Sequence, residues 1–297
     1  MQQVPLIPAK TIISRVKAAS AWFGAEYNMN IYRGCSHGCI YCDSRSDCYR
    51  NHDFDTVKAK ENALELIRDE LRRKVQTGVI ATGSMSDPYN LAERDLKLTR
   101  HALELIHAYD FGVAIATKSA LAARDGDVLQ DIKSHSPTLV KISITTADDT
   151  LASKIEPHVS TPTERFEALR ILAGQGIYCG VLMMPVLPFL EDTEENVLAI
   201  IRKAKEAGAK FVFPAFGMTL RPGNREYYYR KLDEVFPGVK EKHIKRYGDR
   251  YQCTSPHAKK LWSIATAECV RLGLLYDMRT ITRQYKAGYG ERQLTFL

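Results

Sequence analysis

The sequence predicts an α/β fold, a partial (β/α)6 barrel followed by a C-terminal helical extension. Six short apolar or β-branched runs alternate with five stretches of helical periodicity. The alternation spans about 190 residues, which is too few for a full eightfold barrel of ~250 residues. It stops at Arg221, after which only helical patterns follow.

The six predicted strands are continuous apolar runs, as expected when both faces of a parallel sheet are covered. They are residues 27–32, 78–82, 112–117, 139–145, 178–184 and 211–214. The helical stretches between them are residues 57–75, 94–109, 125–135, 162–175 and 193–207. Right-handed crossovers bring the carboxyl ends of all six strands to one rim, where the active sites of such folds lie.

Helix ends carry local signals that support these boundaries. Thr161 precedes Pro162 and Glu164, a pattern typical of a helix N-terminus. Gly176 and Gly208 stand where left-handed C-caps would end the fourth and fifth helical stretches. We therefore divide the chain into a leader (1–26), the barrel (27–220) and a helical extension (221–297) with helices over 224–235 and 255–272.

Composition places the chain among ordinary globular proteins, with 45% apolar and 26% charged residues among 297. The first residues lack a charged segment followed by an apolar one, so we expect no signal peptide. The longest apolar run, 178–190, is interrupted by prolines and is shorter than the ~20 residues that a membrane span needs. We expect a cytoplasmic protein with no membrane partner. The net charge of +7 is a mild bias toward anionic partners.

Three of the seven cysteines, Cys35, Cys39 and Cys42, fall within eight residues directly after the first predicted strand. One loop with this spacing can present three thiolates, which are soft ligands for iron–sulfur clusters or zinc. Three protein ligands leave a metal position open, as in a catalytic centre. The alternative is a closed zinc or cluster site with Cys48 as the fourth ligand. His37 is either a ligand or a hydrogen-bonding loop residue.

The motif Cys-x3-Cys-x2-Cys, with Tyr41 before its last cysteine and a βα array around it, resembles the radical S-adenosylmethionine (SAM) superfamily. The string 34–42, joined by Ser84-Met85-Ser86-Asp87, is similar to the spore photoproduct lyase-like branch, over roughly residues 27–215. The resemblance implies a [4Fe–4S] cluster on Cys35, Cys39 and Cys42 and SAM on its open iron. It implies reductive cleavage of SAM to a 5′-deoxyadenosyl radical that abstracts hydrogen from a substrate. An electron donor such as flavodoxin or ferredoxin would reduce the cluster.

The resemblance also suggests which residues bind SAM. Tyr41 would lie against the adenine, although ordinary packing is the alternative. The segment Gly83, Ser84, Met85, Ser86 and Asp87 would bind the SAM amino group, largely through backbone carbonyls. The competing interpretation is a plain turn at a strand end, with Asp87 accepting backbone hydrogen bonds.

Polar residues interrupt the fourth predicted strand, where Lys141, Ser143 and Thr145 point to one face. Buried hydroxyls need partners, which SAM would supply to Ser143 and Thr145; a water-filled cleft would serve equally well. Arg165, with Glu156, reaches the same rim by resemblance, or is a surface helix residue.

Two positions depart from the lyase. Ser84 stands where the lyase has a cysteine that returns hydrogen to the product radical, and Asp43 where it has a tyrosine. Thymine-dimer repair by that route is therefore doubtful, and Cys179 and Tyr89 are the candidates for a replacement catalytic hydrogen donor.

The substrate is expected to be nucleic acid, from the resemblance and the net charge. Residues 221–250 hold nine Lys or Arg against five acids, with four interleaved tyrosines, a pattern that can track phosphates and stack bases. A solvated helix face anchored by tyrosines is the alternative. A radical SAM enzyme acting on a peptide or small metabolite is the nearest rival, and a non-catalytic metal-binding nucleic-acid module is the distant one.

Overall fold

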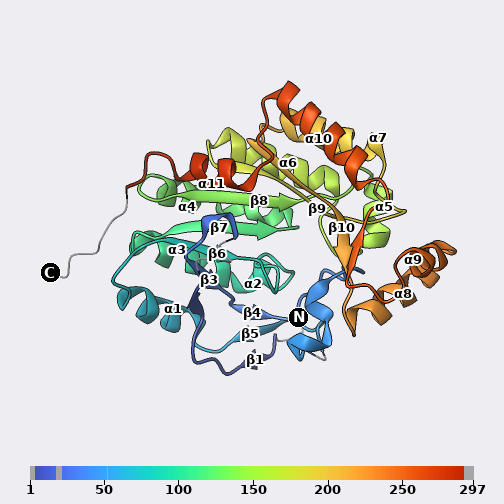
Figure 1. Cartoon of the computed structure of the whole chain (residues 1–297). Coiled ribbons are helices and arrows are strands. Elements are labelled where there is room, and N and C mark those ends of the chain that lie inside the picture. The colour runs from blue at the N-terminus through green and yellow to red at the C-terminus, as the bar shows by residue number, and fades with distance from the viewer. Residues whose placement is uncertain (1–3, 18–21, 52, 291–297) are drawn as a thin grey trace.

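The computed structural model describes residues 4–17, 22–51 and 53–290. Its centre is an eight-stranded sheet in the order β11-β10-β9-β8-β7-β6-β3-β2. The six central strands are parallel, as predicted, and form a curved sheet that does not close into a barrel. Figure 1 shows helices covering the outer side of this sheet. The predicted partial barrel is confirmed.

The parallel strands match the predicted apolar runs in order and number. They are β3 (Tyr27–Met29), β6 (Val79–Thr82), β7 (Gly112–Thr117), β8 (Thr138–Ser143), β9 (Tyr178–Val186) and β10 (Phe211–Thr219). One antiparallel strand is added at each edge, β2 (Ile13–Arg15) and β11 (Gln252–Thr254). The strand predicted to end at residue 214 continues to Thr219, past a register shift between Pro214 and Phe216, because β11 pairs with its second half.

A second, three-stranded sheet contains β1 (Leu6–Ile7), β5 (Lys58–Lys60) and β4 (Tyr32–Arg33). It divides the predicted strand 27–32 between two sheets. It also corrects the helix predicted over 57–75: the first residues pair as β5 between β1 and β4, and α1 runs only over Ala63–Arg72. Tertiary pairing of the backbone here overrides the helical periodicity.

The remaining helices also follow the predicted order, with additions. They are α2 (Glu93–Leu96), α3 (Leu98–Ala108), α4 (Gly126–Lys133), α5 (Asp149–Ile155), α6 (Pro162–Gly174), α7 (Glu194–Glu206), α8 (Asn224–Val235), α9 (Val239–Tyr247), α10 (Ala258–Leu272) and α11 (Met278–Lys286). The expected capping box joins Thr161 and Glu164 at the start of α6. The helix predicted over 94–109 is broken at Lys97. Its φ of 51° lies outside the right-handed helical region, so a helix cannot continue through this residue.

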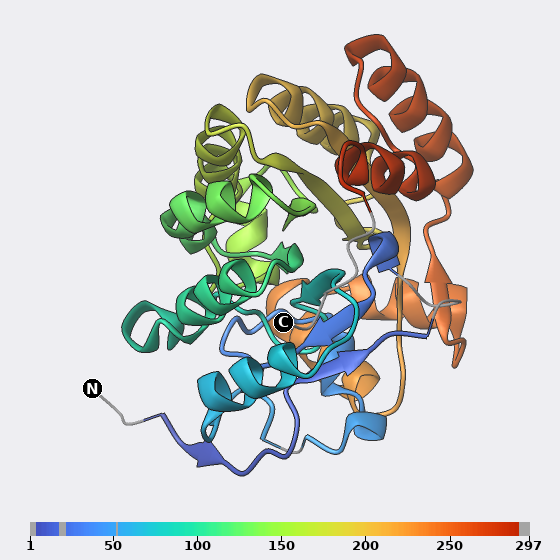
Figure 2. The ribbon, with the colours of Figure 1, turned by 90° about the vertical axis from the view of Figure 1, so that its left-hand side faces the viewer.

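Segments from the two ends of the chain meet at the amino ends of the strands. Phe23, in a short 3₁₀ turn (Trp22–Gly24), is fully buried, and its carbonyl accepts a hydrogen bond of 2.7 Å from the Tyr285 hydroxyl of α11. Figure 2 shows this turn beside α11. These contacts close the end of the barrel opposite the rim.

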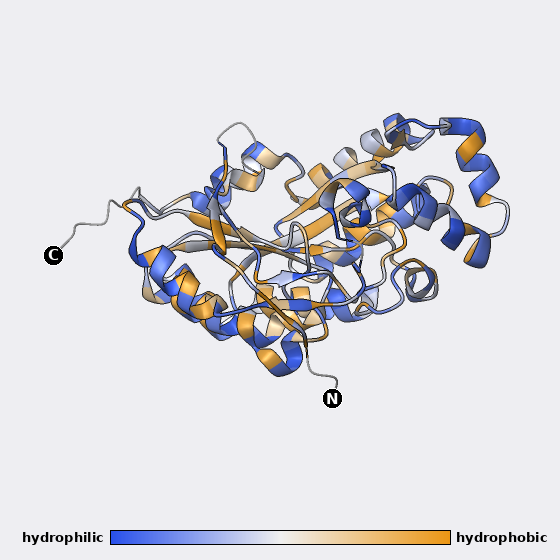
Figure 3. Ribbon diagram, turned by 90° about the horizontal axis from the view of Figure 1, so that it is seen from below, coloured by the Kyte–Doolittle hydropathy of each residue, from blue (hydrophilic) through white to orange (hydrophobic). Residues whose placement is uncertain are grey.

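The apolar core lies on both faces of the sheet. Strands and inward helix faces are hydrophobic in Figure 3, whereas α8 and α9 are largely hydrophilic. In the part of the chain that the structure describes, no helix combines the length and apolar character needed to cross a bilayer.

Candidate active site

The loop 34–42 follows β4 and is shaped by its glycines. Gly34 has a φ of 79°, and a Cβ there would lie 2.3 Å from the carbonyl oxygen of Thr56. Only glycine tolerates both the left-handed backbone and this approach. The amide of Cys35 then donates to the carbonyl of Phe54 at 2.8 Å, and that of Ile40 to the carbonyl of Ile155 at 3.0 Å. The loop is thereby held against the barrel rim.

The three cysteines of the loop line one cavity of about 570 Å³. Its walls come from residues just past β6 and β7, from the carboxyl end of β9 and from the second half of β10. These are carboxyl ends of parallel strands, as predicted for the rim. The cavity is therefore the place where the thiols and the rim residues meet.

Cys35 and Cys39 are buried and Cys42 is half-buried, and the three thiols lie close enough to influence one another. Burial raises the pKa of Cys35 to about 12, and the neighbouring Asp87 adds to the shift. Burial also raises the pKa of Cys39 and Cys42 above its usual range. Without a metal partner these groups are neutral thiols, so binding of a cationic iron centre would be coupled to loss of their protons.

Cys48 does not complete this set. It is exposed, and its sulfur lies 3.4 Å from a guanidinium nitrogen of Arg221, outside the cavity. Among the described residues, no three His, Cys, Asp or Glu side chains are grouped tightly enough to hold a single metal ion. A multinuclear cluster takes one protein ligand on each of several irons, whereas a single zinc ion needs all its ligands around one point. Three thiols that line one cavity therefore fit a cluster better than a zinc ion. His37 faces Asp87, with 3.5 Å between Nδ1 and Oδ2.

The segment 83–87 lines the cavity along its whole length. Gly83 has a φ of 92°, and a Cβ there would lie 1.9 Å from the carbonyl oxygen of Ala116. The Ser86 hydroxyl donates to the carbonyl of Gly34, joining this segment to the cysteine loop. The Asp87 carboxylate accepts from the Thr117 hydroxyl at 2.7 Å and the Lys118 amide at 2.8 Å. Asp87 thus organises the loop, as the simpler interpretation expected, while still facing the cavity.

Lys118 is a cavity residue that the sequence analysis missed. It follows β7 directly, and its ammonium lies 5.6 Å from the centre of the Tyr41 ring. Burial alone would lower the pKa of Lys118, but Cys39, Glu156, Cys42 and Asp87 raise it. The signal that could have found it is a cation immediately after a buried strand, at the rim.

Tyr41 lines the cavity and begins a buried polar network. Its hydroxyl donates to Glu156, whose other oxygen accepts from Arg165. Arg165 is 1% exposed and also donates to the carbonyls of Ser143 at 2.8 Å and Ser160 at 2.7 Å. Burial alone would raise the pKa of Glu156, but Arg165 and Lys118 hold it below its usual range. Arg165 is therefore not a surface residue. It lies behind the cavity wall and supports Tyr41 through Glu156.

Ser143 and Thr145 are buried near the rim but are not among the residues that line the cavity. The Thr145 hydroxyl donates to Glu191 at 2.6 Å. Burial raises the pKa of Glu191 to about 8, so this carboxyl is neutral over much of the physiological range. Thr145 therefore has a protein partner, which the sequence did not suggest.

The two candidate hydrogen donors lie away from the cavity. The Cys179 thiol faces α6, with its sulfur 3.8 Å from the carbonyl of Leu169. Tyr89 is buried in the main core. Neither lines the cavity: Cys179 lies near the amino end of β9, and Tyr89 packs in the core.

Aromatic and cationic side chains lie beside the cavity, next to its lining residue Asp43. Asp43 lines it and lies 3.5 Å from the Arg221 guanidinium, which is 5.8 Å and 5.0 Å from the ring centres of Tyr49 and Tyr251. Residues 216–219 of β10 form the adjoining wall. This wall was not predicted, because the apolar run that predicts the strand ends at residue 214.

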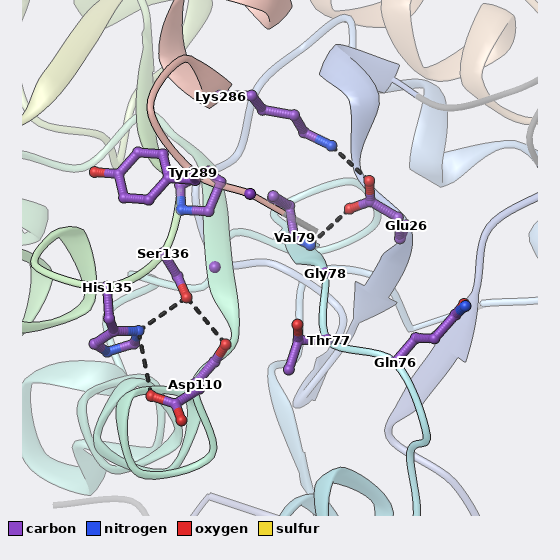
Figure 4. Close-up of a pocket in the computed structure, with 13 residues that line it drawn as sticks. Glu26, Gln76, Thr77, Gly78, Val79, Asp110, His135, Ser136, Lys286 and Tyr289 are labelled. Atoms are coloured by element: carbon purple, nitrogen blue, oxygen red, sulfur yellow. Dashed lines mark hydrogen bonds and ion pairs between the residues drawn. The ribbon is translucent and has the colours of Figure 1, made fainter. Parts of the chain in front are cut away.

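A second cavity, of about 410 Å³, lies at the opposite end of the strands. Figure 4 shows Glu26 paired with Lys286, and His135 beside Ser136 and Asp110. It contains no cysteine, and the amino ends of parallel strands are the stabilising rather than the catalytic end of such folds.

Comparison with known proteins agrees with this geometry. The model of the radical SAM superfamily matches residues 29–198. An uncharacterised protein of Mycobacterium tuberculosis is 31% identical over 250 residues, covering 82% of this chain and 72% of its own length. One from Methanocaldococcus jannaschii is 35% identical over 174 residues, covering 58% and 64%.

Two solved structures have a similar fold. Spore photoproduct lyase, complexed with dinucleoside spore photoproduct, superposes with a TM-score of 0.66 at 17% identity, over 91% of this chain and 80% of the lyase. The radical SAM methyltransferase TsrM from Kitasatospora setae, with tryptophan and a SAM analogue bound, gives 0.56 at 14% identity, over 88% and 58%. At these identities the likeness concerns the fold alone.

Proposed function

The chain belongs to the radical SAM superfamily, and from that premise we propose that it abstracts hydrogen from a nucleic-acid substrate. It is an enzyme of this superfamily, whose cofactors are a [4Fe–4S] cluster and SAM. We further propose which residues hold these cofactors and the substrate.

Cys35, Cys39 and Cys42 would hold the cluster through three thiolates, because they alone among the seven cysteines line the cavity. When bound, the cluster supplies the electron that splits SAM into methionine and the 5′-deoxyadenosyl radical that takes hydrogen from the substrate.

SAM would lie along the segment 83–87, whose backbone faces the cavity beyond the thiols. Lys118 offers the cavity a cation for the SAM carboxylate, and the Tyr41 ring offers an apolar face for the adenine. Glu156 and Arg165 would fix the Tyr41 hydroxyl without touching the cofactor. Ser143 and Thr145 would support the same wall through their buried hydrogen bonds.

The observation that carries the nucleic-acid assignment is the group of aromatic and cationic side chains beside the cavity, which Arg221 joins to the lining residue Asp43. Arg221 lies over Tyr49 and Tyr251, and Tyr251 is 45% exposed. Exposed aromatic rings stacked with a guanidinium are the usual platform for unpaired bases, and cations track the phosphates. Helix α9 adds four Lys or Arg against one Glu, whereas the charges of α8 balance.

Hydrogen return to the product is not part of the proposal. Ser84 takes the position at which the sequence analysis placed the lyase's thiol, and a serine O–H bond is too strong to quench a carbon radical usefully. Abstraction, rather than dimer repair, is therefore the reaction that the cavity supports.

A small metabolite is the second candidate, favoured by one observation. The cavity volume of about 570 Å³ falls in the range of small-molecule sites. A peptide belongs to the same alternative.

The test is formation of 5′-deoxyadenosine from SAM under anaerobic conditions with dithionite as reductant. Single-stranded and duplex oligonucleotides, peptides and small metabolites are added in turn. We expect oligonucleotides to increase turnover and the double variant Arg221→Ala with Tyr251→Ala to raise their KM. Arg279→Ala on α11 is the matched control. Stimulation by peptides or metabolites alone, or an unchanged KM in the double variant, would refute the nucleic-acid assignment.

A further inference from the structure

The edge strand β11 presents polar side chains to the cavity of the candidate site. Gln252 and Thr254 line this cavity, whereas Cys253 between them is fully buried. The antiparallel register places Thr219 of β10 opposite Gln252, and Gly217 opposite Thr254. Residues that are paired in this way point to the same face of a sheet. The side chains of Thr219, Gln252 and Thr254 therefore form one row of polar groups at the cavity, called the polar row below.

Gly217 allows β11 to lie close to β10. Its φ is 134°, and a Cβ there would lie 2.7 Å from the carbonyl oxygen of Cys253 and 2.7 Å from the Cα of Thr254. Only glycine combines this backbone conformation with so close an approach. The polar row therefore stands on a paired strand rather than on a loop, and strands hold the residues of a site more precisely than loops do.

The Gln252 amide is open to a substrate. Gln252 is exposed, and no group in the described part of the chain forms a hydrogen bond with its side chain. An amide offers two N–H donors beside one carbonyl acceptor. The polar row carries no charge, and β10 adds the apolar side chains of Phe216 and Met218 to the same wall. An apolar wall with a few hydrogen-bonding groups suits a neutral planar group such as a nucleobase, whereas phosphates need cations.

Asp43 adds a hydrogen-bond acceptor beside the polar row. It lines the cavity, and its Oδ1 atom is engaged by the Thr219 hydroxyl at 3.4 Å and by Arg221 at 3.5 Å. Its Oδ2 atom accepts from the Tyr49 hydroxyl at 3.1 Å, which leaves this oxygen a further lone pair. An ionised carboxylate cannot donate, so it favours a base that carries an amino group. Thymine carries none.

We infer that Gln252 selects the substrate base, and that the selected base carries an amino group beside a ring-nitrogen acceptor, as adenine and cytosine do. The inference rests on the proposed function, because it names the base that a nucleic-acid substrate offers to the cavity. Glutamine forms two hydrogen bonds with the amino group and N7 of adenine, and carboxylates accept from the amino group of cytosine. Tyr251, of the proposed stacking platform, directly precedes Gln252. The stacking residue and the base-reading residue are therefore neighbours in the chain.

The test measures base preference by equilibrium binding, without turnover. The probes are four single-stranded thymidine oligonucleotides whose central base is thymine, adenine, cytosine or guanine. Fluorescence anisotropy gives the Kd of each probe for the cluster-loaded protein, as wild type and as Gln252→Met, which keeps the length of the side chain but lacks the amide. We expect the wild type to bind the adenine or the cytosine probe about fivefold or more tighter than the all-thymine probe. Gln252→Met should lose this preference, with the Kd for the all-thymine probe unchanged.

Gln284→Met on α11 is the matched control, because it makes the same change at an exposed position outside the cavity. A preference that persists in Gln252→Met, or that disappears equally in Gln284→Met, would overturn the inference. Equal binding of all four probes by the wild type, or tightest binding of the thymine or the guanine probe, would also overturn it. Absence of binding to every probe would count against the proposed function itself, and the inference would fall with it.

Discussion

The ammonium group of Lys118 lies 5.6 Å from the centre of the Tyr41 ring, and both residues line the cavity. One residue follows β7, and the other belongs to the cysteine loop. Their proximity joins a fixed cation and an apolar ring at the place where the cofactor is proposed to bind.

Lys118→Met should weaken SAM binding without unfolding the protein. A charge-assisted hydrogen bond contributes about 1.5–3 kcal/mol, so the Kd for SAM should rise about tenfold to hundredfold. Equilibrium binding to the cluster-loaded protein measures this. Lys205→Met on α7 is the control, and an unchanged Kd in Lys118→Met would remove Lys118 from the site.

Cys39→Ala should abolish assembly of the cluster, whereas Cys48→Ala should not. Cys39 lines the cavity and Cys48 lies outside it. Iron content and visible absorbance after anaerobic reconstitution measure the difference. Equal losses in the two variants would mean that Cys48 is a ligand after all.

Gly83→Ala should disturb the cavity wall, since the added Cβ would lie 1.9 Å from the carbonyl oxygen of Ala116 at a φ of 92°. We expect a loss of SAM affinity and a lower unfolding midpoint, each measured directly. Gly174→Ala is the matched control: nothing lies within 4 Å of its Cβ position in α6. There the change should be neutral or stabilising by up to about 1 kcal/mol.

Glu156→Gln should destabilise the fold strongly, because Arg165 would keep a buried charge without its partner. Breaking one side of a buried ion pair costs about 3–5 kcal/mol, whereas Tyr41→Phe should cost about 1 kcal/mol. Denaturant unfolding of the two variants measures both values. Equal, small effects would show that the Glu156–Arg165 pair contributes little to stability.

Lys141→Met should stabilise the protein most below pH 7. Lys141 is buried in the barrel interior, and burial lowers its pKa to about 7. The Lys141 ammonium lies 4.9 Å from the centre of the Phe23 ring. This cation–π contact stabilises the folded state by only about 0.5–2 kcal/mol. Below pH 7 the folded state carries the full cost of the buried charge.

Between pH 7 and about 10.4 the unfolded chain binds the proton that the folded chain has lost, so wild-type stability rises with pH. The advantage of Lys141→Met should therefore shrink over this window. Paired denaturation curves at several pH values measure it, and an advantage independent of pH would contradict the assignment.

The sequence predicted the fold well where the signal was local. Six apolar runs became six parallel strands, because burial on both faces demands continuous hydrophobicity. The cysteines and the segment 83–87 were predicted at the rim from an equally local signal, because each directly follows a predicted strand. The split of 27–32 between two sheets was missed because strand partners distant in sequence decide it. The helix break at Lys97 was also missed.

By itself, then, the sequence determined the strand order, the rim and the three thiols that face it, through periodicity and spacing along the chain. Only the tertiary structure decided that Lys118 enters the cavity, that Arg165 lies behind Tyr41, and that Cys179 and Tyr89 lie outside the cavity. The reason is physical: a side chain's neighbours depend on how elements pack across the barrel, and no local pattern encodes that packing.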